Sequence, residues 1–337
     1  MSPERRRLSL EETHRLAAEV LVAQGCAQGN AEAVAGIVAM AERDGCPSHG
    51  LFRVPGYVAS LRSGRADGRA VPRVEDAAPG VIRVDAGNGF APPALAAGRP
   101  LLLEKARAQG IAMMVLRRSM HFAALWCDVE PLAEAGLVAL GFVNSRSFLP
   151  PHGGRRVLYG TNPMAFACPR PGAPPMVWDQ ASSALARGEI MLAARDGHEV
   201  PEGAGVDAQG RPTTDPTAIL EGGMQLPFGG YKGASIAMMV ELMGAALGGG
   251  NLGYEAAASH NDDGGPSSAG QCLIAIDPAR SAGDGFLAHA ESLFRRVLAD
   301  GEARLPADRR HANRAHTAVE GIAIPTALYE TLQELRG

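Results

Sequence analysis

The sequence predicts a mixed α/β protein built from several domains. Two observations carry this prediction. The chain has 337 residues, which is long enough for two or three packed domains. Through its middle, short apolar runs typical of strands alternate with amphipathic runs typical of helices. The 42 glycines and 24 prolines indicate that many turns join these elements.

The N-terminal part of the sequence predicts helices. Residues 10–24 and 31–43 are amphipathic, with Asn30 as the expected N-cap of the second helix. A third helix is expected near residues 52–61, after a short loop of sequence DGCPSHG. Further helical segments are expected at the end of the chain, and no internal repeat is visible in the sequence.

The middle of the sequence alternates strands and helices. Residues 234–247 are almost wholly apolar, with Glu241 as their only charge, and are expected to form a core helix. Residues 201–216 indicate a polar loop and residues 254–270 a surface excursion. The other expected elements are strands at 81–84, 111–116, 137–143 and 273–276, two short strands around 160–163, and helices at 95–108, 125–135, 181–194 and 286–298.

The composition argues against several classes of protein. The net charge is −4, whereas a nucleic-acid-binding surface needs clustered positive charge. The five cysteines form no CxxC pair, as expected of reduced thiols, and the nine histidines lack the spacing of a metal site. No apolar run approaches the ~18 residues that span a membrane, and no signal-peptide core is present. We therefore expect a cytoplasmic protein with no metal, and with neither nucleic acid nor membrane as a partner.

Glycine-rich stretches are the first candidates for a nucleotide site. Lys232 is one of only two lysines and lies in the stretch GGYKG, where the backbone and the next helix N-terminus can meet an anion. An ordinary helix start with an exposed lysine explains this stretch equally well. The spacing GxGxxG at Gly248, Gly250 and Gly253 follows a helix and not a strand. We therefore reject a Rossmann site there and expect these glycines to end the helix.

Ser48 and His49 are the best polar catalytic candidates in the sequence. A histidine in a loop between helices can transfer a proton near neutral pH. Arg53 and Tyr57 follow His49 at helical spacing, so the three side chains can face one pocket in which Arg53 binds a carboxylate. The plain alternative is a turn serine beside a surface histidine.

A second candidate lies at a strand-to-helix turn. Residues 121–125, of sequence HFAAL, open a helix after the strand expected at 111–116. Small residues at such a turn admit a ligand against backbone amides, although tight helix packing also explains them.

Several ordered motifs resemble one known family over nearly the whole chain. They are DGCPSHGLFRVPGYVASLRSG, HFAALWCDVEPLAEAGLVAL, GTNPMAF, DQASSALARGEI, PEGAGVDAQGRPTTDP and GGYKGASIAMMVEL. Together they resemble the type II malate/L-lactate dehydrogenase family, which comprises NAD(P)-dependent oxidoreductases without a Rossmann fold. Within it, HFAALWCDVEP and RLPADRR most resemble the Δ1-piperideine-2-carboxylate/Δ1-pyrroline-2-carboxylate reductases.

The resemblance implies a particular α/β fold. A cofactor domain with a largely antiparallel sheet would pack on a helical domain formed from both termini, and the protein would be a homodimer. The implied division of the chain is an N-terminal helical part at 1–75, a mixed α/β region that binds NAD(P) at 76–300, and a helical segment at 301–337 that returns to the first part.

The resemblance also implies roles for individual residues. Ser48 and His49 would be the catalytic pair, with His49 donating the proton, and Glu189 would relay charge to them. Arg53 and Thr161 would bind the substrate carboxylate. The residues implied to line the cofactor are His121, Phe122, Ala123, Ala124, Leu125, Asp179, Gln180, Ala181, Tyr231, Lys232, Arg304, Arg309 and Arg310.

The cofactor and two departures from the family pattern follow from the same comparison. Arg309 and Arg310 suit a 2′-phosphate, which favours NADPH, with NADH as the weaker alternative. Glu189 stands where the reductases have aspartate, and Tyr231 stands where many relatives have histidine. The first departure changes the geometry of the charge relay, and the second changes the contact with the cofactor.

The activity implied by the resemblance is reduction of a small cyclic imino acid to L-proline or L-pipecolate, in proline metabolism or lysine degradation. One alternative keeps the fold and acts on a 2-hydroxy acid of the malate, lactate or ureidoglycolate type. A second alternative is a nicotinamide-nucleotide-binding protein without turnover.

Overall fold

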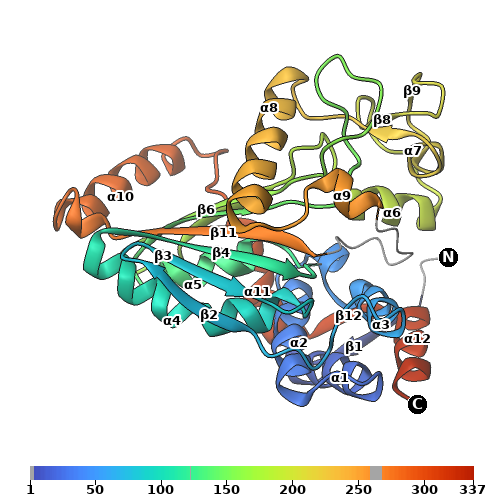
Figure 1. Cartoon of the computed structure of the whole chain (residues 1–337), viewed down its shortest axis with the longest axis horizontal. Helices are drawn as coiled ribbons and strands as arrows, with labels where there is room; N and C mark the ends of the chain where they lie inside the picture. The colour runs from blue at the N-terminus through green and yellow to red at the C-terminus, as the bar shows by residue number, and fades with distance from the viewer. Residues whose placement is uncertain (1–3, 122, 259–267) are drawn as a thin grey trace.

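A seven-stranded sheet organises the centre of the molecule. The computed structural model describes residues 4–121, 123–258 and 268–337 (Figure 1). The strand order is β2-β3-β4-β11-β5-β6-β7, and only β3 and β4 run parallel. The strands are β2 (Arg73–Ala78), β3 (Val81–Asp85), β4 (Ile111–Ser119), β5 (Val138–Val143), β6 (Met164–Cys168), β7 (Met176–Gln180) and β11 (Ala269–Ile276). The prediction of a mixed α/β fold with a largely antiparallel sheet is thus confirmed.

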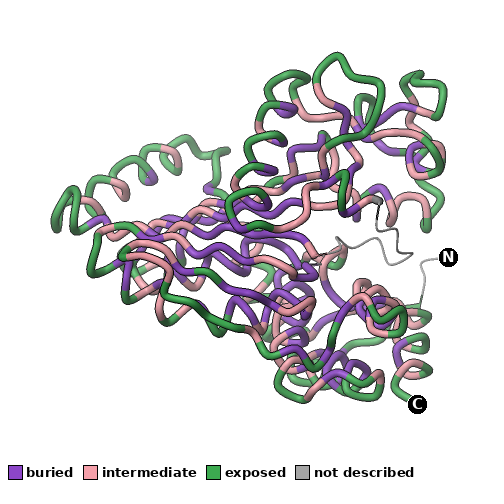
Figure 2. Tube along the Cα trace, in the orientation of Figure 1, coloured by how far each residue is buried: buried purple, intermediate pink, exposed green. Residues whose placement is uncertain are grey.

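Both faces of this sheet are covered. Helices α4 (Ala91–Gln109) and α5 (Trp126–Glu134) bury the main core on one face, around Leu102, Met114 and Leu273. On the other face, Val240 of α8 (Tyr231–Val240) packs against Phe142 and Cys272. The central strands are therefore buried on both sides, as Figure 2 shows, and this explains their continuous apolar sequences.

The two ends of the chain form one helical unit. Strand β1 (Arg5–Leu8) pairs with β12 (Ile322–Pro325), and α12 (Thr326–Arg336) packs beside α1 (Leu10–Ala23) (Figure 1). Helices α2 (Gln28–Arg43) and α3 (Val54–Arg62) complete its apolar core, and α11 (Asp308–Glu320) leads into β12. Ser9 and Glu12 form a capping box that starts α1. The division into three ranges at residues 75 and 300 stays a prediction.

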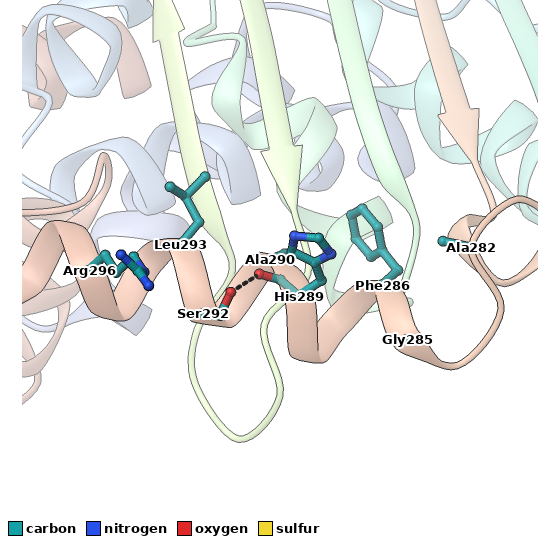
Figure 3. Close-up of a pocket in the computed structure, with 8 residues that line it drawn as sticks. All are labelled: Ala282, Gly285, Phe286, His289, Ala290, Ser292, Leu293 and Arg296. Atoms are coloured by element: carbon teal, nitrogen blue, oxygen red, sulfur yellow. Dashed lines mark hydrogen bonds between the residues drawn. The ribbon is translucent and has the colours of Figure 1, made fainter.

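A smaller three-stranded sheet follows β7 in the chain. Its three short strands are β8 (Gly205–Val206), β9 (Pro212–Thr213) and β10 (Met224–Gln225), beside α6 (Arg187–Asp196) and α7 (Pro216–Leu220). Ile190 and Ile219 meet in its core. The remaining helices are α9 (Gly253–Ala258) and α10 (Gly285–Leu298), of which α10 lies at the outer end of the molecule in Figure 1. Figure 3 shows an open groove on α10, lined by Phe286, His289 and Leu293 among others, to which none of the predicted site residues belongs.

Four local predictions need correction. Helix α2 begins at Gln28, because Asn30 uses its side chain to bond the carbonyls of Gly68 and Ala70 instead of capping. Helix α6 begins only at Arg187. Strands β6 and β7 both follow residues 160–163 instead of surrounding them. Segment 201–216 contains short strands and is not all loop.

The expected core helix at 234–247 needs a further correction, which is the most instructive one. The α-helix stops at Val240 and continues as a π-helical turn, η3 (Glu241–Ala245). The apolar Met238 and Leu242 are 48% and 55% exposed, whereas the one charged residue, Glu241, is buried. The helical segment ends at Gly248, one of the three glycines expected to end it, and the left-handed C-cap is the next residue, Gly249. Among the described helices, none is long and apolar enough to cross a membrane.

Candidate active site

Ser48, His49 and Arg53 lie on one compact loop. Two 3-10 turns, η1 (Pro47–His49) and η2 (Leu51–Arg53), join α2 to α3. The Ser48 hydroxyl lies 3.0 Å from Nδ1 of His49, so Nε2 is the ring nitrogen left for a ligand. Arg53 donates from Nε to the Ser48 carbonyl at 2.8 Å, which fixes the loop and leaves its Nη atoms for an anion.

The electrostatics of this loop favour an anionic ligand. Burial, followed by the charges of Arg53 and His121, lowers the pKa of His49 to about 3. Within the described ranges, neither His49 nor Arg53 forms an ion pair with a carboxylate. The lowered pKa favours the neutral form of His49 at pH 7. A carboxylate bound to Arg53 would raise the pKa of His49 and so prepare it to carry a proton.

Glu42 holds the loop of Ser48, His49 and Arg53 through a hydrogen bond, and it was not anticipated from the sequence. It is buried in the last turn of α2, and its Oε1 accepts the backbone N–H of Leu51 at 2.8 Å. Burial raises the pKa of Glu42 to about 7. A signal for it did exist, because Glu42 is a charge four residues after Val38 on the apolar face of α2.

His121 belongs to a second buried histidine couple. Its Nε2 lies 3.0 Å from Oδ2 of Asp128, and the same oxygen accepts Nε2 of Gln271 at 2.7 Å. All three side chains are buried. Because Nε2 faces Asp128, the Nδ1 atom of His121 is the one available to a ligand. The sequence reasoning missed Asp128 and Gln271, which come from α5 and β11 and meet His121 only in the folded chain.

Three of the segments predicted to bind the cofactor meet at the start of α5. Asp179, in β7, accepts the backbone N–H of Trp126 at 3.1 Å, and burial raises the pKa of its carboxyl group. Arg310 lies 4.4 Å from the centroid of the Trp126 ring and donates to the Val177 carbonyl at 2.8 Å. Ala123, Ala124 and Leu125, next to this junction, are buried.

This junction fits a nucleotide cofactor. Nη1 of Arg310 and Nε1 of Trp126 are buried donors that meet no acceptor in the described part of the chain. A buried donor without a partner costs about 1–3 kcal/mol, so a bound phosphate or ribose oxygen would relieve this cost. The residues present are therefore suited to a phosphorylated dinucleotide.

The other residues predicted to bind the cofactor have no described contact with the junction at the start of α5. Tyr231 and Lys232 are exposed at the start of α8. The same helix lies close to the 179–181 segment, because Gly233 packs on the carbonyl of Ser182. Ala181 is half-buried and precedes Ser182. Gln180, Arg304 and Arg309 are exposed and form no ion pair within the described ranges. Phe122 lies outside the described residues.

Thr161 is held on the sheet side of the site. Buried Glu241 accepts the side-chain amide of Asn162 at 2.9 Å and the N–H of Gly253 at 3.0 Å, which stabilises the GTNP segment. The Thr161 carbonyl accepts the N–H of Ser182 at 2.7 Å, and the N–H of Thr161 donates to Ser145 Oγ at 3.0 Å. The described contacts therefore join Thr161 to the 179–182 turn and do not join it directly to Arg53.

Glu189 is not placed against the catalytic loop. Its side chain is exposed and forms no hydrogen bond or ion pair in the part of the chain that the structure describes. The contact from α6 comes instead from Gly188, where an added Cβ would lie 2.9 Å from Arg53 Nη2 and 3.1 Å from Ser48 Cβ. A side chain at position 188 would therefore displace Arg53 or Ser48, and the expected charge relay through Glu189 finds no support in this geometry.

Comparison with known proteins identifies the family. The family model for malate/L-lactate dehydrogenase matches residues 8–333. A Δ1-pyrroline-2-carboxylate/Δ1-piperideine-2-carboxylate reductase from Pseudomonas syringae pv. tomato is 51% identical over 94% of this chain and 93% of its own. The chain belongs to the malate/L-lactate dehydrogenase family of oxidoreductases, and the resemblance inferred from the sequence is confirmed.

Two further relatives sharpen the comparison. The crystal structure of Δ1-piperideine-2-carboxylate reductase from P. syringae pv. tomato superposes with a TM-score of 0.94, at 50% identity, over 98% of this chain and 99% of that one. A (2R)-3-sulfolactate dehydrogenase (NADP(+)) from Chromohalobacter salexigens is 44% identical over 97% of both chains. The family thus includes relatives named for both C=N and hydroxy-acid chemistry.

Proposed function

We propose that this protein is an NADPH-dependent reductase of cyclic imino acids. Its substrates would be Δ1-pyrroline-2-carboxylate, Δ1-piperideine-2-carboxylate or both, and its products L-proline or L-pipecolate. The observation that carries the proposal is the pairing of His49, whose pKa is lowered to about 3, with an Arg53 that has no carboxylate partner in the described ranges. The names of relatives with up to 51% identity support the same substrate class.

Arg53 would bind the substrate carboxylate and so position the ring. The bound negative charge would raise the pKa of His49, whose Nε2 would then protonate the imine nitrogen. Ser48 would keep Nδ1 occupied and hold the ring in place. Protonation withdraws electrons from C2 of the C=N bond, and such acid catalysis is typically worth ~10²–10⁴-fold. The bound nicotinamide cofactor would supply the hydride to C2.

NADPH is the proposed cofactor, with NADH as a weaker substitute. The buried Nη1 of Arg310 and the exposed cations of Arg304, Arg309 and Lys232 are donors suited to phosphate. The printed name of the sulfolactate dehydrogenase relative includes NADP(+). A homodimer in the cytoplasm completes the proposal, and both of these statements stay predictions.

A 2-hydroxy acid dehydrogenase is the second candidate, and the sulfolactate dehydrogenase relative favours it. The same His49 would then accept the proton of a hydroxyl group while Arg53 held the acid. This candidate keeps every contact of the loop and changes only the group that meets His49.

One assay separates the two candidates. Purified protein is mixed with NADPH and Δ1-pyrroline-2-carboxylate, or with pyruvate or oxaloacetate, and absorbance is followed for wild type, His49→Ala and His198→Ala. His198 is an exposed histidine outside the site and serves as the matched control. We expect oxidation with the imine, lost in His49→Ala and kept in His198→Ala. Oxidation with the oxo acids alone would favour the hydroxy-acid candidate, and cofactor binding without any turnover would contradict both.

A further inference from the structure

Arg314 joins two buried carboxylates that come from different parts of the fold, and no role described above uses it. It lies on α11, and its Nη2 atom is 2.6 Å from Oδ2 of Asp44 and 3.0 Å from Oε2 of Glu130. The side chains of Asp44 and Glu130 are 0% and 2% exposed. Burial alone would raise the pKa of Asp44, but hydrogen bonds from Arg314 and Arg43 lower it below its usual value. Because a buried charge is costly without a partner, this ion-pair cluster holds α11, α5 and the end of α2 together.

Asp44 lies just before the catalytic loop, residues 46–53. It is the C-cap of α2, and η1, which carries the catalytic pair, begins three residues later. Two further contacts fix this point against α11. Asn313 donates from Nδ2 to the Asp44 carbonyl at 3.3 Å, and Thr317 donates from Oγ1 to the Arg43 carbonyl at 2.9 Å. Three side chains of α11 thus hold the segment from which the loop starts.

The second carboxylate leads to the junction at the start of α5 that fits a nucleotide cofactor. Glu130 lies on α5 four residues after Trp126, and Arg310 lies on α11 four residues before Arg314. The two helices therefore meet at two successive turns, since Arg310 lies 4.4 Å from the centroid of the Trp126 ring and Arg314 pairs with Glu130. Arg314 thus contacts both the start of the catalytic loop and the helix that begins at the junction.

We propose that Arg314 is a positioning residue, which fixes the catalytic loop, and with it His49, relative to the cofactor junction. It does so by neutralising Asp44 and Glu130 together. A proton donor and a hydride donor must meet the two ends of one C=N bond, so a displacement of about 1 Å can cost ~10²-fold in rate. This inference rests on the proposed function, since it requires a proton from His49 and a hydride from the cofactor.

The test compares variants by kinetics and by hydrogen exchange. The variants are Arg314→Lys, Arg314→Gln and the double variant Arg314→Gln/Glu130→Gln. In the double variant the one remaining buried carboxylate, Asp44, keeps its ion pair with Arg43 at 2.6 Å, so the fold is less at risk than in Arg314→Gln. Arg336→Gln, which breaks an exposed ion pair on α12, is the matched control.

Two readouts are used. Steady-state kinetics with the imino acid is run with NADPH and with NADPH that carries deuterium in place of the transferred hydride. Hydrogen exchange of the amides of residues 46–53 is followed by mass spectrometry in NADP⁺-saturated protein, with β11 as the internal reference.

We expect the double variant to bind NADP⁺ as wild type does and to lose ~10- to 100-fold in kcat with little change in KM for NADPH. Its deuterium isotope effect on kcat should rise, because hydride transfer becomes slower than the other steps. The loop should exchange faster while β11 does not. Arg314→Lys should recover part of the loss in kcat, and Arg336→Gln should match wild type.

A folded double variant with wild-type kcat would overturn the inference. A fall in kcat with an unchanged isotope effect, or with unchanged exchange of the loop, would show a merely structural role and overturn it as well. Hydrogen exchange needs no turnover, so it reports on Arg314 independently of the reaction. A wild type that does not oxidise NADPH with the imine would contradict the proposed function, and with it the role of Arg314 in that reaction, even if the loop exchanged faster in the double variant.

Discussion

The two histidines of the site, half-buried His49 and buried His121, have opposite surroundings. His49 meets a neutral hydroxyl, that of Ser48, and its pKa is lowered to about 3 by desolvation and then by the charges of Arg53 and His121. His121 meets the buried carboxylate of Asp128, which Gln271 also binds. His121 thus has a permanent anionic partner inside the protein, whereas His49 depends on a ligand for one. The comparison teaches that the partner, and not the residue type, decides which histidine is suited to give up a proton.

Removing the anionic partner of His121 is the strongest way to break this comparison. Asp128→Ala leaves His121 and Gln271 buried without an acceptor, so we expect a loss of about 3–5 kcal/mol in the free energy of unfolding. Chemical denaturation measures it. Ser48→Ala is the matched change at His49 and should cost less than about 1 kcal/mol, because the hydroxyl is neutral and only half-buried. Equal losses in the two variants would contradict the distinction.

The pH dependence of stability should report His49 directly. Its pKa is about 3 in the fold against a usual value of 6.5, so the unfolded chain binds more protons at intermediate pH. The contribution of neutral His49 is therefore complete above pH 6.5 and is lost as the pH falls toward 3. Unfolding measured from pH 7 to pH 4 should show this slope in wild type. The slope should be reduced in His49→Gln, and an unchanged slope would assign it to other groups.

Glu42 sharpens the contrast because its pKa shift has the opposite sign. A carboxyl group whose pKa is raised from 4.5 to about 7 is stabilising when protonated, and this contribution is lost as the pH rises through that interval. Glu42→Gln keeps an oxygen for Leu51 N–H without the charge. We expect it to raise the free energy of unfolding at pH 8 by about 1–3 kcal/mol. Glu42→Ala, which removes the acceptor, should be destabilising at every pH.

Glu189 should give the smallest effect. Its carboxylate is exposed and separate from His49. Glu189→Gln should therefore change the free energy of unfolding, and the activation free energy obtained from kcat, by no more than about 0.5 kcal/mol each. Steady-state kinetics with the imino acid provides the measurement. A large fall in kcat, with a shift in its pH profile, would restore the charge relay that the family pattern implies and would give His49 an anionic partner after all.

Much of the fold could be predicted because it depends on local patterns. The apolar runs at β3, β4, β5 and β11 and the amphipathic run of α1 carry their own periodicity. Sequence motifs likewise predicted the family and the loop of Ser48, His49 and Arg53. These features can be predicted from the sequence because each depends on residues that are close together in the chain.

The exceptions are residues whose environment comes from distant segments. Local periodicity made 234–247 a core helix, yet Glu241 is buried there because Asn144, Asn162 and Gly253 supply donors to both of its oxygens. The couple of His121 with Asp128 is completed by Gln271 across the sheet. Sequence spacing cannot predict such contacts, because the residues that form them are far apart in the chain.

The sequence by itself determined the family, the strand and helix types, and which loop carries the polar chemistry. Only the tertiary structure decided which of these polar side chains have charged partners and how their pKa values are shifted. It left Arg53 without a carboxylate partner in the described ranges, placed Asp128 against His121, and left Glu189 exposed to solvent. The physical reason is that hydrogen-bond pairing and burial, which set the protonation of a side chain, depend on atoms that are close in space and far apart in the chain.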